Sequence, residues 1–441
     1  MAQPTVTICS GCGVSSELHG AFHNEPNSIR KFCPPCWAKR DAANDRIYLG
    51  TYLFLGLLGV VLAFYKSQWG FLLITFFLFH LFGILATVPH ELGHALAARA
   101  FGMHVFQVVV GVGKKLFECR ILGVLVEFRT IPYGGFTLAL SEEHGRVRIR
   151  QFMYALAGPV ANLIVALVVL AVVGWDRIAD FKPHQKVSPW TLLFASNALC
   201  FVTNLIPRSF PSAAGQMVSD GVHLIRAFTL KKEHIDDLRS SYYAAHASAA
   251  RQRCDMKAAA EWTDRGLKEY PADRALLLQH GTNLIEAQRF PEARALFQKL
   301  LQECDADDLG FRALLMNDIA CANALMCGAD ASGLEQADEY SDYALKVLPW
   351  MSGVKGTRGM VLVERGALPD GIKLLEASLR DAEEPWGRAQ SACFLAIAEA
   401  RRGNAEAAAA YLKLARQLQP DCFLIAKAEQ ALLGTNAGAV A

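Results

Sequence analysis

Residues 87–102, TVPHELGHALAARAFG, contain two histidines and a glutamate at a spacing that suits a metal site. On a helix, His90 and His94 are four residues apart and project from one face, where both imidazoles can bind one Zn²⁺. Glu91 lies beside them and can take a proton from a zinc-activated water. The pattern predicts hydrolytic zinc chemistry. The alternative is that both histidines are buried, hydrogen-bonded residues at a helix end.

Two histidines leave a zinc site one protein ligand short, and few later residues qualify. Residues 204–226, NLIPRSFPSAAGQMVSDGVHLIR, contain Asn204 and Asp220 after an apolar run. Asp220 offers a carboxylate at the start of a helix-like segment. His223 is the competing candidate.

A second group of metal-ligand residues lies near the N-terminus, in the sequences CSGC and FCPPCW. These give two CxxC pairs separated by twenty residues, formed by Cys9, Cys12, Cys33 and Cys36. Two such turns complete a tetrahedral thiolate shell around one zinc ion. A disulfide pair suits an oxidising compartment, and a redox CxxC needs a βαβ context, so we predict a structural zinc.

The 441-residue chain is 53% hydrophobic, which is high for a wholly soluble protein. Four apolar runs, at residues 48–65, 71–100, 153–175 and 190–206, approach the length that crosses about 30 Å of hydrocarbon. The first two are separated by only residues 66–70, which predicts a tight helical hairpin. We therefore predict a membrane core of about four helical spans rather than the buried core of a soluble protein.

The distribution of basic residues predicts the orientation of these spans. Arginines and lysines are frequent before the first run and between the second and third, and sparse in the other two connections. The N-terminus, residues 101–152 and the C-terminal region are therefore expected in the cytoplasm. Eight scattered cysteines fit that reducing compartment. We expect a multi-pass protein of a bacterial inner membrane. The net charge of +2 gives no case for nucleic-acid binding.

From about residue 240 the sequence becomes charged and rich in alanine and leucine, with a period near 34 residues. A repeat that starts at Arg274 places Gly281, Ala293 and Phe297 at small, small and aromatic positions of a helix pair. Matching positions recur at Pro271, Pro349, Gly359, Ala415 and Pro420. The pattern resembles about five tetratricopeptide repeats in an α-solenoid. An all-helical domain without repeats is the alternative.

Five motifs occur in a fixed order: HELGHALAARAFG, GVG at 111–113, IPYGGF at 131–136, AGPVAN at 157–162, and NLIP followed by SDG. Together they resemble the site-2 protease family of intramembrane zinc metalloproteases, over about residues 71–228. This resemblance implies cleavage of a peptide bond in or beside a transmembrane segment of a membrane-protein substrate. Its motifs also include small residues, Ala157, Gly158 and Ala161, that let a span pack closely on the catalytic helix.

The resemblance also assigns roles to residues. It implies that His90, His94 and Asp220 bind the catalytic zinc, with Glu91 as general base and acid. Asn204 would orient the substrate or support the oxyanion. Gly134, Gly135 and Phe136 would belong to a membrane-associated β-hairpin that pairs with an extended substrate.

The predicted architecture is mainly α. It comprises a zinc ribbon at residues 1–45, a membrane metalloprotease domain with a small β-hairpin insert at 46–235, and tetratricopeptide-like repeats at 240–435. Two Zn²⁺ ions are expected, one catalytic and one structural. The repeats are expected to bind a protein or peptide partner. The alternative function is a catalytically silent, membrane-anchored scaffold. The sequence does not indicate the oligomeric state.

Overall fold

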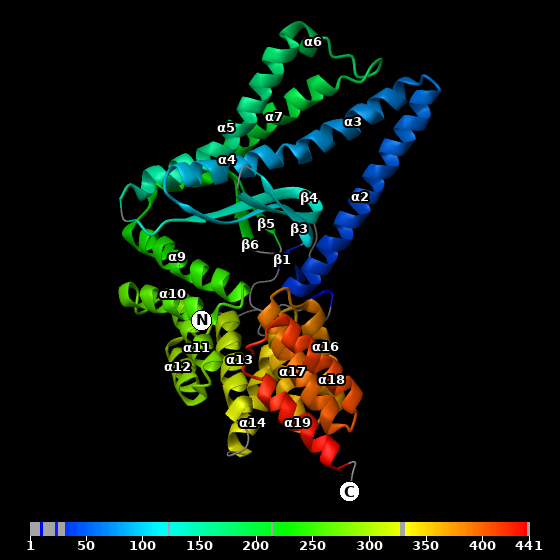
Figure 1. Cartoon of the computed structure of the whole chain (residues 1–441). Helices are drawn as coiled ribbons and strands as arrows, with labels where there is room; N and C mark the ends of the chain where they lie inside the picture. Colours follow the sequence, from blue (N-terminus) through cyan, green and yellow to red (C-terminus); the bar gives the residue numbers. More distant parts are fainter. Residues whose placement is uncertain are drawn as a thin grey trace, which may run out of the picture. The chain divides into compact units, whose positions relative to one another are not determined.

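The computed structural model describes residues 9–11, 23–24, 31–121, 124–143, 145–212, 215–326 and 331–438, and these are mainly helical (Figure 1). The chain divides into two compact units. One contains the described residues up to Cys36 and those from Tyr243 onward, and the other is Trp37–Tyr242. The predicted domain boundaries near 45 and 240 fall inside helices α2 (Pro34–Phe64) and α9 (Lys232–Gln252), where composition changes but the helix continues.

Unit Trp37–Tyr242 begins with the predicted helical hairpin. Helix α2 (Pro34–Phe64) is followed by α3 (Gln68–Leu85), and Lys66 turns the chain with a left-handed φ of 56°. The two helices meet closely beside the turn, because a Cβ on Gly70 would lie 2.2 Å from the backbone nitrogen of Ala63. A glycine is therefore required where these backbones approach.

The helix that carries HELGH is α4 (Thr87–Ala100), which continues α3 beyond Ala86. It packs on α5 (Val147–Val173). After α5 the chain continues through α6 (Trp175–Ala179), α7 (Pro189–Leu205) and α8 (Asp220–Thr229). A Cβ on Gly93 of α4 would lie 2.7 Å from the Ala161 Cβ of α5. The predicted close packing through small residues is confirmed at this contact.

Among the residues that the structure describes, two helices are long and apolar enough to cross a membrane, Gln68–Ala100 and Val147–Val173. They match the second and third predicted spans. The first corresponds to the shorter apolar part of α2, Leu49–Phe64, and the fourth to α7 with 17 residues. At 1.5 Å per residue, α7 reaches about 26 Å, just short of the hydrocarbon thickness. A core of four spans therefore remains a proposal.

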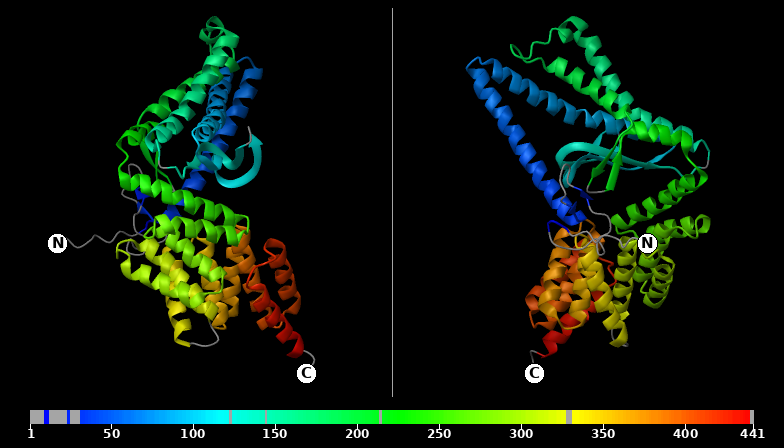
Figure 2. Two further views of the ribbon diagram at one scale, coloured as in Figure 1. Left: turned by 60° about the vertical axis from the view of Figure 1, so that its left-hand side comes forward. Right: turned by 180° about the vertical axis from the view of Figure 1, so that it is seen from behind.

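A long antiparallel hairpin joins α4 to α5, formed by β3 (His104–Ile121) and β4 (Val124–Leu140). It curls, so that Val109 pairs with Phe136 on one side and with Glu127 on the other (Figure 2). Alternate apolar residues of the hairpin, among them Val108 and Val126, are buried against Leu92 of α4. The predicted hairpin insert is thus present and larger than the IPYGGF motif alone.

Two further antiparallel pairs are short. Strands β1 (His23–Asn24) and β2 (Lys31–Phe32) lie between the two cysteine pairs of the sequence. Strands β5 (Ser209–Ser212) and β6 (Gly215–Val218) form the connection from α7 to α8. The second of these pairs places Asp220 at the first position of α8.

The C-terminal region is a series of paired antiparallel helices. The pairs are α9 (Lys232–Gln252) with α10 (Met256–Glu269), α11 (Arg274–Glu286) with α12 (Phe290–Glu303), α13 (Leu309–Met326) with α14 (Ala331–Val347), α15 (Ser352–Glu364) with α16 (Leu368–Asp381), and α17 (Pro385–Arg401) with α18 (Ala405–Leu418). Helix α19 (Ile425–Gly438) follows the last pair.

The predicted repeat phase agrees with these pairs, since α11 begins at Arg274. A Cβ on Gly281 would lie 2.2 Å from the Phe297 ring, and Ala293 and Phe297 are fully buried. Gly359 has the same role in α15, where a Cβ would lie 2.7 Å from Leu375. The small residues that set the period are those at which the two helices of a pair touch.

Candidate metal centre

Helix α4 and the start of α8 bring the three predicted ligands together. The His90 Nε2 atom is 3.0 Å from Asp220 Oδ2, and the His94 Nε2 atom is 3.3 Å from Asp220 Oδ1. The two Nε2 atoms are 3.3 Å apart. All three ligand atoms lie within 4.8 Å of one another, and both histidines are buried. His223, the competing candidate, is not part of this group.

The residues on either side of Asp220 hold it at the end of α7. The Ser219 hydroxyl donates to the Ile206 carbonyl at 2.8 Å and accepts from the Arg208 backbone N–H at 3.0 Å. A Cβ on Gly221 would lie 2.2 Å from the Leu205 carbonyl oxygen. The SDG sequence thus clamps the start of α8 onto the preceding helix.

An asparagine of α5 orients the ring of His90. The Asn162 Oδ1 atom lies 2.8 Å from His90 Nδ1, while its Nδ2 donates to the Ala86 carbonyl at 2.8 Å and to Asn197 Oδ1 at 3.0 Å. Because Nδ2 has two acceptors, Oδ1 faces the histidine and accepts from Nδ1–H. The Nε2 lone pair of His90 is left free for a metal.

The ring of His94 is oriented by the backbone of α5. Its Nδ1 lies 2.7 Å from the Tyr154 carbonyl oxygen, so Nδ1 is again the protonated nitrogen. The ring fits against Gly158, where a Cβ would lie 2.3 Å from His94 Nε2 and 2.9 Å from His90 Cε1. The glycine therefore makes room for both imidazoles at once.

This donor set fits zinc. Two neutral imidazoles with free Nε2 lone pairs and one carboxylate are ligands that catalytic zinc sites use, with a fourth position left for water or substrate. Each histidine donates its other ring N–H to a protein oxygen, as metal-ligating histidines do. Bound there, Zn²⁺ would lower the pKa of a bound water and polarise the carbonyl of a substrate.

Glu91 is fixed by strand β4. The Thr137 hydroxyl lies 2.8 Å from Glu91 Oε2 and 3.1 Å from the Glu91 backbone carbonyl. The preceding Gly135 passes so close that a Cβ would lie 2.9 Å from Glu91 Oε1. Glu91 is only 4% exposed. Its carboxylate is held beside the His–His–Asp group but is not part of it.

The other predicted site residues lie at different distances from this group. Gly135 contacts Glu91, Gly134 adopts a φ of 70°, and Phe136 is 44% exposed on the same strand. Asn204 is on the last turn of α7, where its Nδ2 donates to the Cys200 carbonyl of the same helix at 3.1 Å. In the described residues, no hydrogen bond joins Asn204 to Glu91 or to the three ligands.

The structure also brings together three of the four N-terminal cysteines, Cys9, Cys33 and Cys36. Cys12 lies outside the described residues. The backbone N–H groups of Gly11 and Cys33 both donate to the Cys9 sulfur at 3.3 Å. Such bonds stabilise a thiolate, which is the form that binds zinc. The described cysteines therefore suit a structural zinc.

Replacing Cys9 by serine is expected to remove one zinc ion per chain and leave the other. Serine lacks the sulfur that the two backbone N–H groups approach, and it is a poor zinc ligand. The measurement is the zinc content per chain of the purified protein, determined by mass spectrometry of the metal. Cys200→Ser, in the middle of α7, is the control and should leave zinc content unchanged. An equal zinc content in wild type and the Cys9 variant would contradict the assignment.

The sequence did not indicate several residues of the centre. Thr137, Asn197 and the Tyr154 carbonyl were not predicted, and Asn162 entered only as the last residue of the AGPVAN motif. Its position in AGPVAN, four residues after Gly158 on one helix face, is the signal that could have linked it to the histidines.

Comparison with known proteins agrees with this geometry. The chain is 30% identical over 124 residues to a candidate zinc metalloprotease of Clostridium acetobutylicum, with 24% of this chain and 36% of the relative covered. It is 24% identical over 138 residues to one of Thermotoga maritima, with 26% and 27% covered. The chain thus spans about a third or less of these curated relatives.

Among solved structures, the chain is similar to a thermophilic TPR protein of Thermus thermophilus, with 20% identity and a TM-score of 0.34. That alignment covers 44% of this chain and 99% of the other. A TPR protein with an unusual peptide-binding site aligns at 19% identity and a TM-score of 0.25, covering 43% and 90%.

Residues 76–234 match Peptidase family M50. The match contains α4, the β3–β4 hairpin and helices α5 to α8, and so every residue of the His–His–Asp group. Over these residues the chain is therefore similar to Peptidase family M50 and to the candidate zinc metalloproteases described above.

Proposed function

We propose that this protein is a zinc endopeptidase that hydrolyses peptide bonds in or next to transmembrane segments of membrane proteins. The observation that carries the proposal is the arrangement of Glu91 beside His90, His94 and Asp220, with both Nε2 atoms directed at one point by Nδ1 hydrogen bonds. A structural zinc site has four protein ligands, whereas this group of three leaves one coordination position open for water or substrate.

The chain's own residues then have defined roles. Glu91 takes a proton from the attacking water and passes it to the leaving amine, as a general base and then a general acid. Thr137 holds the carboxylate in place for both transfers. Asn204 would contact the substrate after a change of its side-chain rotamer, because its amide now faces its own helix.

The proposed membrane location follows from the exposure of apolar helices. Only 11% of the apolar window of Gln68–Ala100 and 28% of that of Val147–Val173 are buried within the protein. Large side chains such as Phe64 and Val172 are 83% and 76% exposed. The core helices of a soluble protein are buried instead. These surfaces fit lipid, and we propose that α2 and α7 also cross or enter the bilayer.

The position of strand β4 supports a role in substrate binding. Residues 135–137 pair with β3 along one edge and lie beside Glu91 on the other side. A helical substrate hides its carbonyls in internal hydrogen bonds, so cleavage requires local unwinding. We propose that the unwound segment pairs with this strand near Gly135 and Phe136, which presents its scissile bond to the centre.

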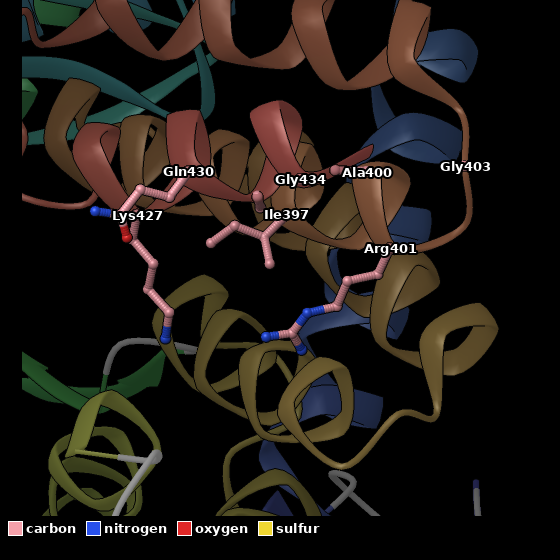
Figure 3. A pocket seen from close by; sticks show the side chains of 8 residues that line it. Ile397, Ala400, Arg401, Gly403, Lys427, Gln430 and Gly434 are labelled. Atoms are coloured by element: carbon pink, nitrogen blue, oxygen red, sulfur yellow. The ribbon is translucent and has the colours of Figure 1, made fainter. Parts of the chain in front are cut away.

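The repeat helices are the proposed site for a protein or peptide partner. A cavity of about 640 Å³ lies between α17 and α19, and Figure 3 shows Arg401 and Lys427 on either side of Ile397. Both cations bind the single carboxylate of Glu364, at 2.9 and 2.8 Å. One positive charge remains uncompensated in this trio, which favours an acidic segment of the partner.

The test is a comparison of membrane-protein N-termini in cells that carry wild type or Glu91→Gln. The proposal expects a small set of new N-termini, mapping in or beside transmembrane segments, that is present with wild type and missing with the variant. Identical N-termini in both strains, together with a defect that appears only on deletion of residues 243–441, would support the scaffold instead.

A further inference from the structure

A cavity of about 360 Å³ lies where the C-terminal end of α4 meets the N-terminal end of α5. None of its lining residues belongs to the metal centre or to the cysteine site. The lining consists of Ala100, Phe101, Gly102, Arg146, Ile149 and Arg150. The volume is in the range of cavities that hold small ligands.

The charged part of the lining is positive. The Arg150 side chain is 13% exposed; its Nη1 donates to Ser141 Oγ at 2.9 Å, and it forms an ion pair with Glu143, which is 68% exposed. Arg146 is exposed, and among the described residues it forms no ion pair. The lining therefore carries two guanidinium groups, of which only Arg150 is paired, with the well-solvated carboxylate of Glu143. Guanidinium forks match the geometry of a phosphate group.

The rest of the lining is apolar and leads along the helix. Phe101 and Ile149 are 36% and 54% exposed. Leu96, which is 43% exposed, lies four residues before Ala100 and so on the same face of α4. A free inorganic anion would gain nothing from this apolar strip, whereas a lipid acyl chain would be covered by it.

The position of the cavity agrees with both the positive and the apolar part of its lining. It lies at the ends of the two helices that are apolar enough to cross a membrane, Gln68–Ala100 and Val147–Val173. In a bilayer, the ends of spanning helices reach the layer of phosphate headgroups. Basic pockets between membrane helices at this level are suited to anionic headgroups.

We propose that this cavity binds one anionic phospholipid, with its headgroup phosphate on Arg146 and Arg150 and an acyl chain along Leu96. The proposal rests on the membrane placement proposed above and does not depend on protease activity. A lipid held there bridges α4, which carries the two histidines of the metal centre, and α5, which orients them.

The test is native mass spectrometry of the full-length protein in a neutral detergent, titrated with phosphatidylglycerol or with phosphatidylcholine of the same acyl chains. Wild type is expected to retain one phosphatidylglycerol in preference to phosphatidylcholine. Arg146→Asn should weaken phosphatidylglycerol binding about fivefold, the effect of one arginine near an anionic headgroup. Asparagine suits position 146 because its backbone φ is 59°, in the left-handed region.

Arg146→Lys keeps the charge but loses the guanidinium fork, so its affinity should lie between those of wild type and Arg146→Asn. Arg177→Asn, at an exposed arginine of α6, is the matched control and should have no effect. Equal retention of the two lipids, or wild-type affinity in Arg146→Asn, would overturn the proposal. Displacement of phosphatidylglycerol by millimolar inorganic phosphate would overturn it in favour of a free-phosphate site.

Alkaline carbonate extraction of the cell membranes separates this proposal from the membrane placement. Protein that is released by carbonate contradicts both the placement and the lipid site. Protein that resists extraction but shows no lipid preference contradicts the lipid site alone.

Discussion

The Glu91→Gln variant is expected to lose about a thousandfold in kcat/KM, the size of a general base contribution, while zinc content and folding stay as in wild type. The amide has nearly the shape of the carboxylate, and its oxygen can still accept the hydrogen bond from the Thr137 hydroxyl that now lies 2.8 Å from Oε2. What it cannot do is take a proton from water.

The measurement is cleavage of a substrate identified by N-terminal mapping, in purified and reconstituted protein. Glu118→Gln is the control, because Glu118 lies on β3 with its side chain 45% exposed and, among the described residues, paired only with Lys115. It should retain wild-type kcat/KM. Undiminished cleavage by Glu91→Gln with zinc bound would contradict the role of Glu91 as the base.

The Gly158→Ala variant is expected to weaken zinc binding at the His–His–Asp group by about 10- to 100-fold, the effect of disturbing residues that orient metal ligands. The new methyl group would lie 2.3 Å from His94 Nε2 and 2.9 Å from His90 Cε1. Neither ring can turn aside freely, because their Nδ1 atoms are bonded to the Tyr154 carbonyl and to Asn162. Both ligand atoms must therefore leave their common point.

Zinc retained per chain after equilibration with a competing chelator measures this effect, and activity should fall in parallel. Gly83→Ala is the matched control, since a Cβ at Gly83 of α3 has nothing within 4 Å. It should keep full zinc and activity. Zinc binding by Gly158→Ala as tight as that of wild type would contradict the inference that α5 orients the two rings.

The parts of the site that the sequence could predict are local. His90, Glu91 and His94 share one helical turn, so helical periodicity alone places them together. The helix pairs of the repeats are also local, and Gly281 and Phe297 marked their phase. Asp220 was predicted by its residue type and by family resemblance, because nothing local relates it to a helix more than a hundred residues earlier.

The residues that escaped prediction act across the fold. Thr137 reaches Glu91 only after β4 has curled back onto β3, and Tyr154 contributes a backbone carbonyl, which no residue type reveals. The lengths of the spans also differ from the prediction. Hydropathy locates the start of the apolar run, not the start of the helix. Helix α2 begins earlier, at Pro34, and includes the charged residues that precede the apolar run.

In the proposed function, one strand performs two tasks. The residues of β4 that we propose to pair with the substrate are continuous with Thr137, which holds the Glu91 carboxylate. A chain that paired out of register would press on Gly135 and shift the base from its working position. Discrimination would then occur after binding, in the rate of the chemical step. Poor substrates would be released intact, and affinity alone would be a weak guide to which proteins are cut.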